Sequence, residues 1–125
     1  MDLSKYEMTS IEEITMPRTF KAALYDVLKR IDTHCAEMQL THVFLFGSAA
    51  RGEALFGSDL DILLLTDAER ERNVRIKVIE HDLADDTAYV PIQITVRKTC
   101  RFIDQEAYVC GFNAKRPQKF LCKSE

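Results

Sequence analysis

Apolar side chains recur at steps of three and four residues in the first third of the chain. Between Pro17 and Met38 the repeat includes Phe20, Leu24 and Ile31, while lysine, arginine and aspartate occupy other positions of the helical wheel. Such spacing predicts an amphipathic helix of about 20 residues with one face toward a core. Pro17 suits the first turn of that helix, because its missing N–H would have no intrahelical partner there.

Three later segments have the pattern of β-strands. Residues 42–46 are rich in β-forming side chains, and residues 58–65 alternate at first and then become continuously apolar. The continuous half is typical of a strand that is covered on both faces. Residues 89–96 make the third segment, with Pro91 near its start, where a missing backbone donor is tolerated.

Helical segments are expected between and after these strands. Small residues after Gly47 can open a short helix, a capping-box pattern at residues 66–69 predicts a helix into the low eighties, and residues 99–109 can form a last helix. A capping box at residues 10–13 predicts a short turn near the N-terminus. The alternation of helices and strands predicts an α/β or α+β fold, in which helices flank a small mixed β-sheet.

The composition indicates one domain over residues 1–125. Hydrophobic residues make up 46% of the chain and charged residues 30%, which is enough for a core without disulfide or metal staples. The core is expected at about residues 18–110, followed by a basic C-terminal tail at residues 111–125. The longest apolar run is too short for a membrane span and the N-terminus lacks a secretory pattern, so we expect a cytoplasmic location and no membrane partner.

Charge and cysteine spacing limit the partners further. The net charge of −3 argues against a protein that coats nucleic acid. Residues 97–125 are basic, and they either approach triphosphate, RNA or an acidic protein, or form a solvated end that touches nothing. The four cysteines lack the spacing of zinc ligands. His34, His42 and His81 are interpreted as ordinary helix-edge, strand-start and helix-surface residues.

The candidate functional residues are concentrated in residues 47–61. Backbone N–H groups at the start of a short helix, together with the Ser48 hydroxyl, can cradle phosphate oxygens, and Gly47 lets a ligand approach the backbone closely. Asp59 and Asp61 are two positions apart on a strand, so they share a face. Like-charge repulsion disfavours such a pair without a cation, and Mg²⁺ prefers oxygen ligands. The segment therefore predicts a site for magnesium and phosphate.

These residues resemble the sequence signature of the DNA polymerase beta-like nucleotidyltransferase superfamily. That signature is Gly-Ser, two residues, Arg-Gly, and then Ser-Asp-x-Asp on the following strand. Its fixed positions are all present, as Gly47, Ser48, Arg51, Gly52, Ser58, Asp59 and Asp61. The spacing is similar to that of the small prokaryotic members, the minimal nucleotidyltransferases, and the resemblance extends roughly over residues 20–99.

The resemblance implies a role for each matching residue. The implied nucleotide-binding residues are Gly47, Ser48, Arg51 and Ser58. Asp59 and Asp61 would be the catalytic residues that bind magnesium, and the metal would position an incoming hydroxyl in line with the α-phosphate of a nucleoside triphosphate, most often ATP. Arg51 has two alternative roles, which are neutralisation of phosphate charge and an ion pair that holds the small helix in place.

One position departs from the family pattern. Active members carry a third carboxylate on the later strand, which completes the metal site and serves as base, and the pattern places it at Gln93. The Gln93 amide has an acceptor oxygen but no charge, and it cannot take a proton near pH 7. Other acids can replace this carboxylate only if the fold brings one close. The candidates are Glu80, Asp85, Asp86 and Asp104.

Two functions follow from these observations. The first is an enzyme that transfers a nucleoside monophosphate, most often AMP in small members, from a magnesium nucleotide to a hydroxyl. Small members often act as antitoxins that pair with a helical HEPN-type toxin, and they can modify a tyrosine on it. The second is a relative with weak or no catalysis, favoured by Gln93, which neutralises a toxin by contact or assembles as a subunit, with itself or with a partner.

Overall fold

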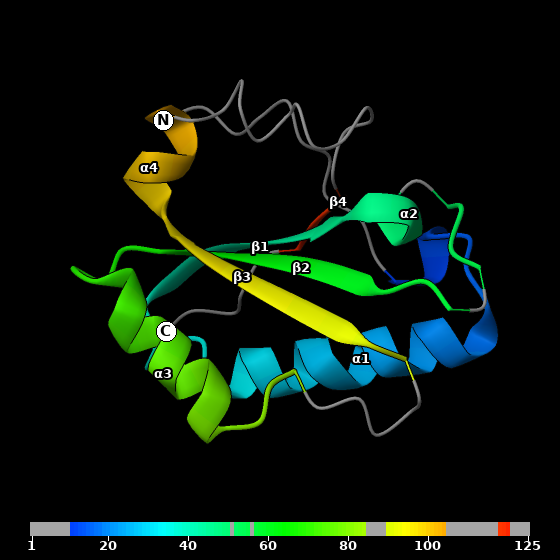
Figure 1. Cartoon of the computed structure of the whole chain (residues 1–125), viewed down its shortest axis with the longest axis horizontal. Helices are drawn as coiled ribbons and strands as arrows, with labels where there is room; N and C mark the ends of the chain where they lie inside the picture. Colours follow the sequence, from blue (N-terminus) through cyan, green and yellow to red (C-terminus); the bar gives the residue numbers. More distant parts are fainter. Residues whose placement is uncertain (1–10, 51, 56, 85–89, 105–117, 121–125) are drawn as a thin grey trace.

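The structure is a computed structural model of the chain that describes residues 11–50, 52–55, 57–84, 90–104 and 118–120 (Figure 1). Its elements, in chain order, are η1 (Ile11–Glu13), α1 (Arg18–Thr33), β1 (Leu40–Phe46), α2 (Gly47–Ala50), β2 (Leu60–Thr66), α3 (Glu71–Glu80), β3 (Ile92–Lys98), α4 (Thr99–Asp104) and β4 (Gln118–Phe120). The predicted alternation of helices and strands is confirmed.

The strands form one mixed sheet in the order β3-β2-β1-β4. β1 runs antiparallel to β2 and to β4, whereas β2 and β3 are parallel and are connected through α3. Figure 1 shows α1 and α3 on one side of the sheet, and α4 on the other side at the end of β3. The predicted fold class, a small mixed sheet flanked by helices, is therefore confirmed.

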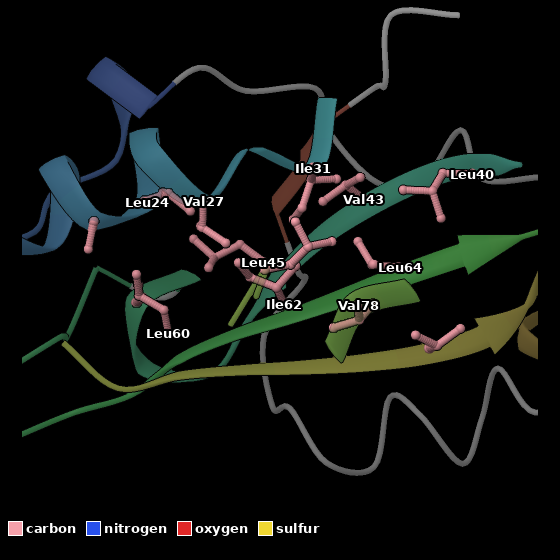
Figure 2. Packing of buried hydrophobic residues seen from close by; sticks show 14 of the residues in the cluster. Leu24, Val27, Ile31, Leu40, Val43, Leu45, Leu60, Ile62, Leu64 and Val78 are labelled. Carbon is pink, nitrogen blue, oxygen red and sulfur yellow. The ribbon is translucent and has the colours of Figure 1, made fainter. Parts of the chain in front are cut away.

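The core lies between α1 and the sheet. Leu24, Val27 and Ile31 on α1 are at most 1% exposed, and Figure 2 shows them gathered with the apolar side chains of β1 and β2. The three-and-four spacing brings these side chains to one face of the helix, and alternate strand positions face them. Each fully buried aliphatic side chain of this kind contributes about 1.5–3 kcal/mol to stability.

β2 is buried on both faces. Ile62 and Leu64 belong to the core that α1 covers, and Leu63 and Leu65, which alternate with them, are also buried. This confirms the interpretation of the continuous apolar run as a strand that is covered on both sides. β2 carries Asp61, and Asp59 lies just before its first residue, Leu60. This strand is thus the most enclosed among those described.

The predicted C-terminal end of α1 and the predicted start of α3 were wrong by several residues. α1 ends at Thr33, because the chain then turns back: the Leu40 N–H donates to the Cys35 carbonyl and Gln39 has a positive φ of 53°. α3 begins at Glu71 and has no side-chain cap at its start. The Thr66 hydroxyl instead accepts from the Ala68 N–H at 2.9 Å, so it closes a turn at the end of β2.

Two points concern the C-terminal part. α4 is described from Thr99 to Asp104, as expected for the start of the 99–109 helix, and the rest of that prediction lies outside the described residues. β4 was not predicted, although its three residues within the basic tail pair with β1. Among the helices that the structure describes, none is long and apolar enough to cross a membrane.

Candidate active site

The turn after β1 is held by small buried residues. α2 follows β1 directly, and the Ala49 and Ala50 side chains are 0% and 7% exposed. The Glu53 N–H donates to the Ser48 carbonyl at 2.8 Å, which closes the end of this short helix. Ser48 is half-buried, with its hydroxyl on the helix that opens at Gly47. Alanines at these two positions let α2 lie close against the sheet.

Gly47 lies directly against the Asp61 carboxylate. The β1–β2 register pairs Phe46 with Asp61, and a Cβ placed on Gly47 would come within 2.5 Å of Asp61 Oδ2. Gly47 also has a positive φ of 74°, a conformation that other residues adopt at a cost. The structure therefore brings the Gly-Ser turn and the aspartate pair together. From the sequence we expected a ligand to lie close to the Gly47 backbone, and in the structure the Asp61 carboxylate lies there.

Asp59 and Asp61 form a half-buried pair of like charges. Burial, and secondarily the Asp59 carboxylate, raise the pKa of Asp61 above the usual range of an aspartate. Both effects disfavour the charged form of Asp61, and a bound cation would offset both. Carboxylate oxygens are the ligands that Mg²⁺ prefers, so this pair fits a magnesium ion.

Ser58 closes the turn that precedes Asp59. Its hydroxyl accepts from the Leu55 N–H at 3.0 Å, and its own N–H donates to the Leu55 carbonyl at 2.8 Å. Sequence reasoning placed Ser58 among the nucleotide-binding residues and did not foresee this turn. A serine followed by an aspartate after a glycine is a local signal for such a turn.

Gln93 lies beside Asp61 on the neighbouring strand. The parallel register of β2 and β3 pairs Asp61 with Gln93, and partners in a parallel register project to the same face about 4.8 Å apart. The Gln93 side chain is exposed. The position that departs from the family pattern is therefore adjacent to the aspartate pair.

Of the other candidate residues, three lie outside the described part of the chain and two are the last residues of α3 and α4. Arg51, Asp85 and Asp86 lie outside the described residues, so the two alternative roles of Arg51 stay predictions. Glu80 is the last residue of α3 and is exposed, and Asp104 is the last residue of α4.

The raised pKa of Asp61 predicts a pH-dependent stability effect. The folded protein holds the Asp61 proton more tightly than the unfolded chain, so the free energy of unfolding falls as pH rises from about 3.9 through the folded pKa, and stays lower above it. Asp61→Asn removes this ionisation. Without magnesium at neutral pH, we expect the variant to be more stable than the wild type by about 0.5–2 kcal/mol, measured by thermal unfolding in a chelator.

The same measurement has two internal checks. The advantage of Asp61→Asn should shrink below about pH 4, and added Mg²⁺ should stabilise the wild type alone. Asp67→Asn, at an exposed position beyond the other end of β2, is the matched control and should change little. A wild type as stable as Asp61→Asn at neutral pH in chelator would contradict the expected cost of the charge.

Comparison with known proteins identifies the family of the chain. A family model described as a nucleotidyltransferase domain matches residues 28–115, which is more than half of the chain. A crystal structure from Sulfolobus solfataricus, described as a candidate nucleotidyltransferase, is similar with 22% sequence identity and a TM-score of 0.45, covering 72% of this chain and 82% of that chain. No curated protein matches the chain. On the family match, the chain belongs to the nucleotidyltransferase domain family.

Proposed function

We propose that the protein transfers a nucleoside monophosphate, with ATP as the preferred donor, from a magnesium nucleoside triphosphate to a hydroxyl group. Nucleotidyl transfer in general follows from the family, whose members use nucleoside triphosphates and Mg²⁺. The observation that carries the proposal is that the Asp61 carboxylate packs against Gly47, with the Asp59 carboxylate nearby. A pure scaffold has no need for such a pair, because its charges repel each other.

Each residue has a defined part in this proposal. Asp59 and Asp61 would hold magnesium, and the bound ion would neutralise charge on the phosphates during transfer. The Gly-Ser turn, with the Ser48 hydroxyl and backbone N–H groups, would bind the β- and γ-phosphates. Ser58 would position Asp59 by closing the turn at residues 55–58. Pyrophosphate is the leaving group.

The amide at position 93 favours an acidic acceptor. A glutamine cannot take the proton of the attacking hydroxyl. The missing base therefore lowers the reaction rate less for a nucleophile that ionises more readily. A tyrosine phenol has a pKa of about 10, far below that of an aliphatic alcohol. A tyrosine on a partner protein is therefore the acceptor that suits this site best.

An exposed apolar side chain in the loop next to the site also supports a protein acceptor. Leu55, in the loop that Ser58 closes, is 72% exposed, and a partner surface could cover this apolar side chain. We propose a helical toxin of the HEPN type as that partner, with this chain as the antitoxin, in line with the minimal nucleotidyltransferases that it resembles. The alternative, favoured by Gln93, is an antitoxin or assembly subunit that acts by contact with little or no catalysis.

Nucleotide binding tests the proposal. In isothermal titration with ATP, GTP, CTP and UTP, with and without Mg²⁺, we expect magnesium-dependent binding that is strongest for ATP. Asp59→Asn/Asp61→Asn should weaken it at least about 100-fold, because the metal loses both carboxylates. Asp67→Asn/Glu69→Gln changes the charge equally at exposed positions beyond the other end of β2, and should bind as the wild type does.

Two results would count against the enzyme. One is a folded wild type that binds no nucleotide. The other is magnesium-dependent binding that survives in Asp59→Asn/Asp61→Asn. Retained neutralisation of a toxin by that double variant would then support the contact-only alternative.

A further inference from the structure

A second group of polar side chains lies at the opposite end of β1 from the Gly-Ser turn. Glu37 Oε1 accepts from His34 Nδ1 at 3.2 Å and from His81 Nε2 at 3.0 Å. The two imidazole rings stack, with centroids 3.7 Å apart and planes 10° from parallel. β1 is seven residues long, so this group lies roughly 20 Å from Gly47.

Two helix ends meet at this group. His34 is the C-cap residue of α1 and His81 is the C-cap residue of α3. The C-terminal end of a helix carries a partial negative charge, which favours a cation nearby. Glu37 adds a full negative charge, because hydrogen bonding from Lys77 in the first place, and from both imidazoles, holds the pKa of Glu37 below its usual range.

We propose that His34, Glu37 and His81 bind a zinc ion, at a site separate from the aspartate pair. Two imidazole nitrogens and one carboxylate oxygen form a ligand set typical of zinc. The three ligand atoms lie within 4.8 Å of one another. A tetrahedral zinc with bonds of about 2.0–2.1 Å separates its ligands by roughly 3.3 Å, close to the two distances from Glu37 Oε1.

The two imidazole rings must leave their stacked arrangement to join Glu37 at one ion, because parallel rings cannot direct two in-plane lone pairs at the same point. The parallel rings must tilt toward each other so that both nitrogen lone pairs meet, and the side chains of His34 and His81 are 28% and 26% exposed, which leaves room for that rotation. The zinc would take the place of the two hydrogen-bond protons that now point at Glu37 Oε1. A fourth ligand position stays open to water.

Lys77 limits the affinity of the site. Its ammonium group lies 3.1 Å from Glu37 Oε2, so Glu37 can offer only Oε1 to the metal. The positive charge also opposes the ion directly. The zinc site would connect the turn after α1 to the end of α3, two segments far apart in the sequence, and its effect is therefore on stability.

Zinc titration of the untagged full chain tests the proposal. We place the test in the Asp59→Asn/Asp61→Asn background, so that the aspartate pair cannot take the ion. One equivalent of zinc should bind at neutral pH and raise the Tm by several degrees at saturation. His34→Gln or His81→Gln should weaken binding at least about 100-fold, since even outer-shell changes at metal sites cost 10- to 100-fold.

Two more variants locate the site. Lys77→Met should bind zinc more tightly, because it removes a like charge and frees the second carboxylate oxygen. Cys100→Ser removes an exposed thiol and should change nothing. With Co²⁺ in place of zinc, the visible spectrum should show weak bands of nitrogen and oxygen ligation and no strong charge-transfer band from a thiolate.

Three outcomes would overturn the proposal. They are no zinc binding by the folded protein, binding that survives in both histidine variants, and binding that Cys100→Ser abolishes. Each variant is first compared with its parent by thermal unfolding in chelator, so a loss of zinc binding is read only from folded protein. Because the aspartate pair is absent from this background, failure of the zinc site leaves the proposed nucleotidyl transfer untouched.

Discussion

Gln93→Asp is expected to raise the rate of nucleotidyl transfer to a phenolic acceptor by about 10²-fold, the lower end of the contribution of a positioned general base, because a phenol ionises readily and depends less on that base. Gln93 pairs with Asp61 in the β2–β3 register, so an aspartate there adds a carboxylate next to the metal ligands. Its side chain is exposed, and the exchange therefore leaves the core intact. The measurement is pyrophosphate release with ATP, Mg²⁺ and a phenolic acceptor.

Thr95→Asp is the matched control for this gain. Thr95 lies two positions along β3, on the same face and also exposed, but it pairs with Leu63 instead of Asp61. The added charge is the same, while position 95 is displaced from position 93 by roughly 7 Å along the strand, away from the partner of Asp61. Equal rates in both variants, or no gain in Gln93→Asp, would show that position 93 does not limit the chemistry.

Gly47→Ala is expected to abolish magnesium–nucleotide binding, with a loss of affinity of at least about 100-fold. The new Cβ would lie within 2.5 Å of Asp61 Oδ2, so the carboxylate must move away from the turn, and metal ligands tolerate little displacement. The positive φ of 74° adds a backbone cost of about 1–2 kcal/mol. Isothermal titration measures the affinity, and urea unfolding measures the stability.

Gly57→Ala separates the two effects. Gly57 also has a positive φ, of 96°, but a Cβ there meets nothing within 4 Å. This variant should lose similar backbone stability and keep nucleotide binding. If both variants lost binding equally, strain in the loop would explain the loss, and the contact between Gly47 and Asp61 would have no special role.

Local patterns predicted the elements of the fold because their causes are local. The spacing of Leu24, Val27 and Ile31 and the alternation at the start of β2 are properties of short segments. The ends of α1 and α3 depend instead on contacts across the chain, such as the bond from the Thr66 hydroxyl to the Met38 carbonyl at 2.7 Å. β4 forms by pairing with β1, and its three residues carry no strand pattern of their own.

The same distinction between local and long-range causes applies to the candidate site. Two aspartates two positions apart were predicted to share a face of one strand. The Asp59 carboxylate does lie close enough to raise the pKa of Asp61, but Asp59 precedes the strand, which begins at Leu60. The seat of Asp61 on Gly47 depends on the β1–β2 register, which residue spacing does not reveal. The approach of His81 to Glu37 joins positions 44 residues apart, so residue spacing could not indicate this contact.

β2 has one more consequence for ligand binding. It lies between β1 and β3, hydrogen-bonded on both sides, and its apolar side chains are buried on both faces. The backbone that carries Asp61 is therefore ordered by folding, before any ligand arrives. Binding of a metal or nucleotide then costs little conformational entropy at this ligand, and affinity depends mainly on charge and on the fit of the phosphates.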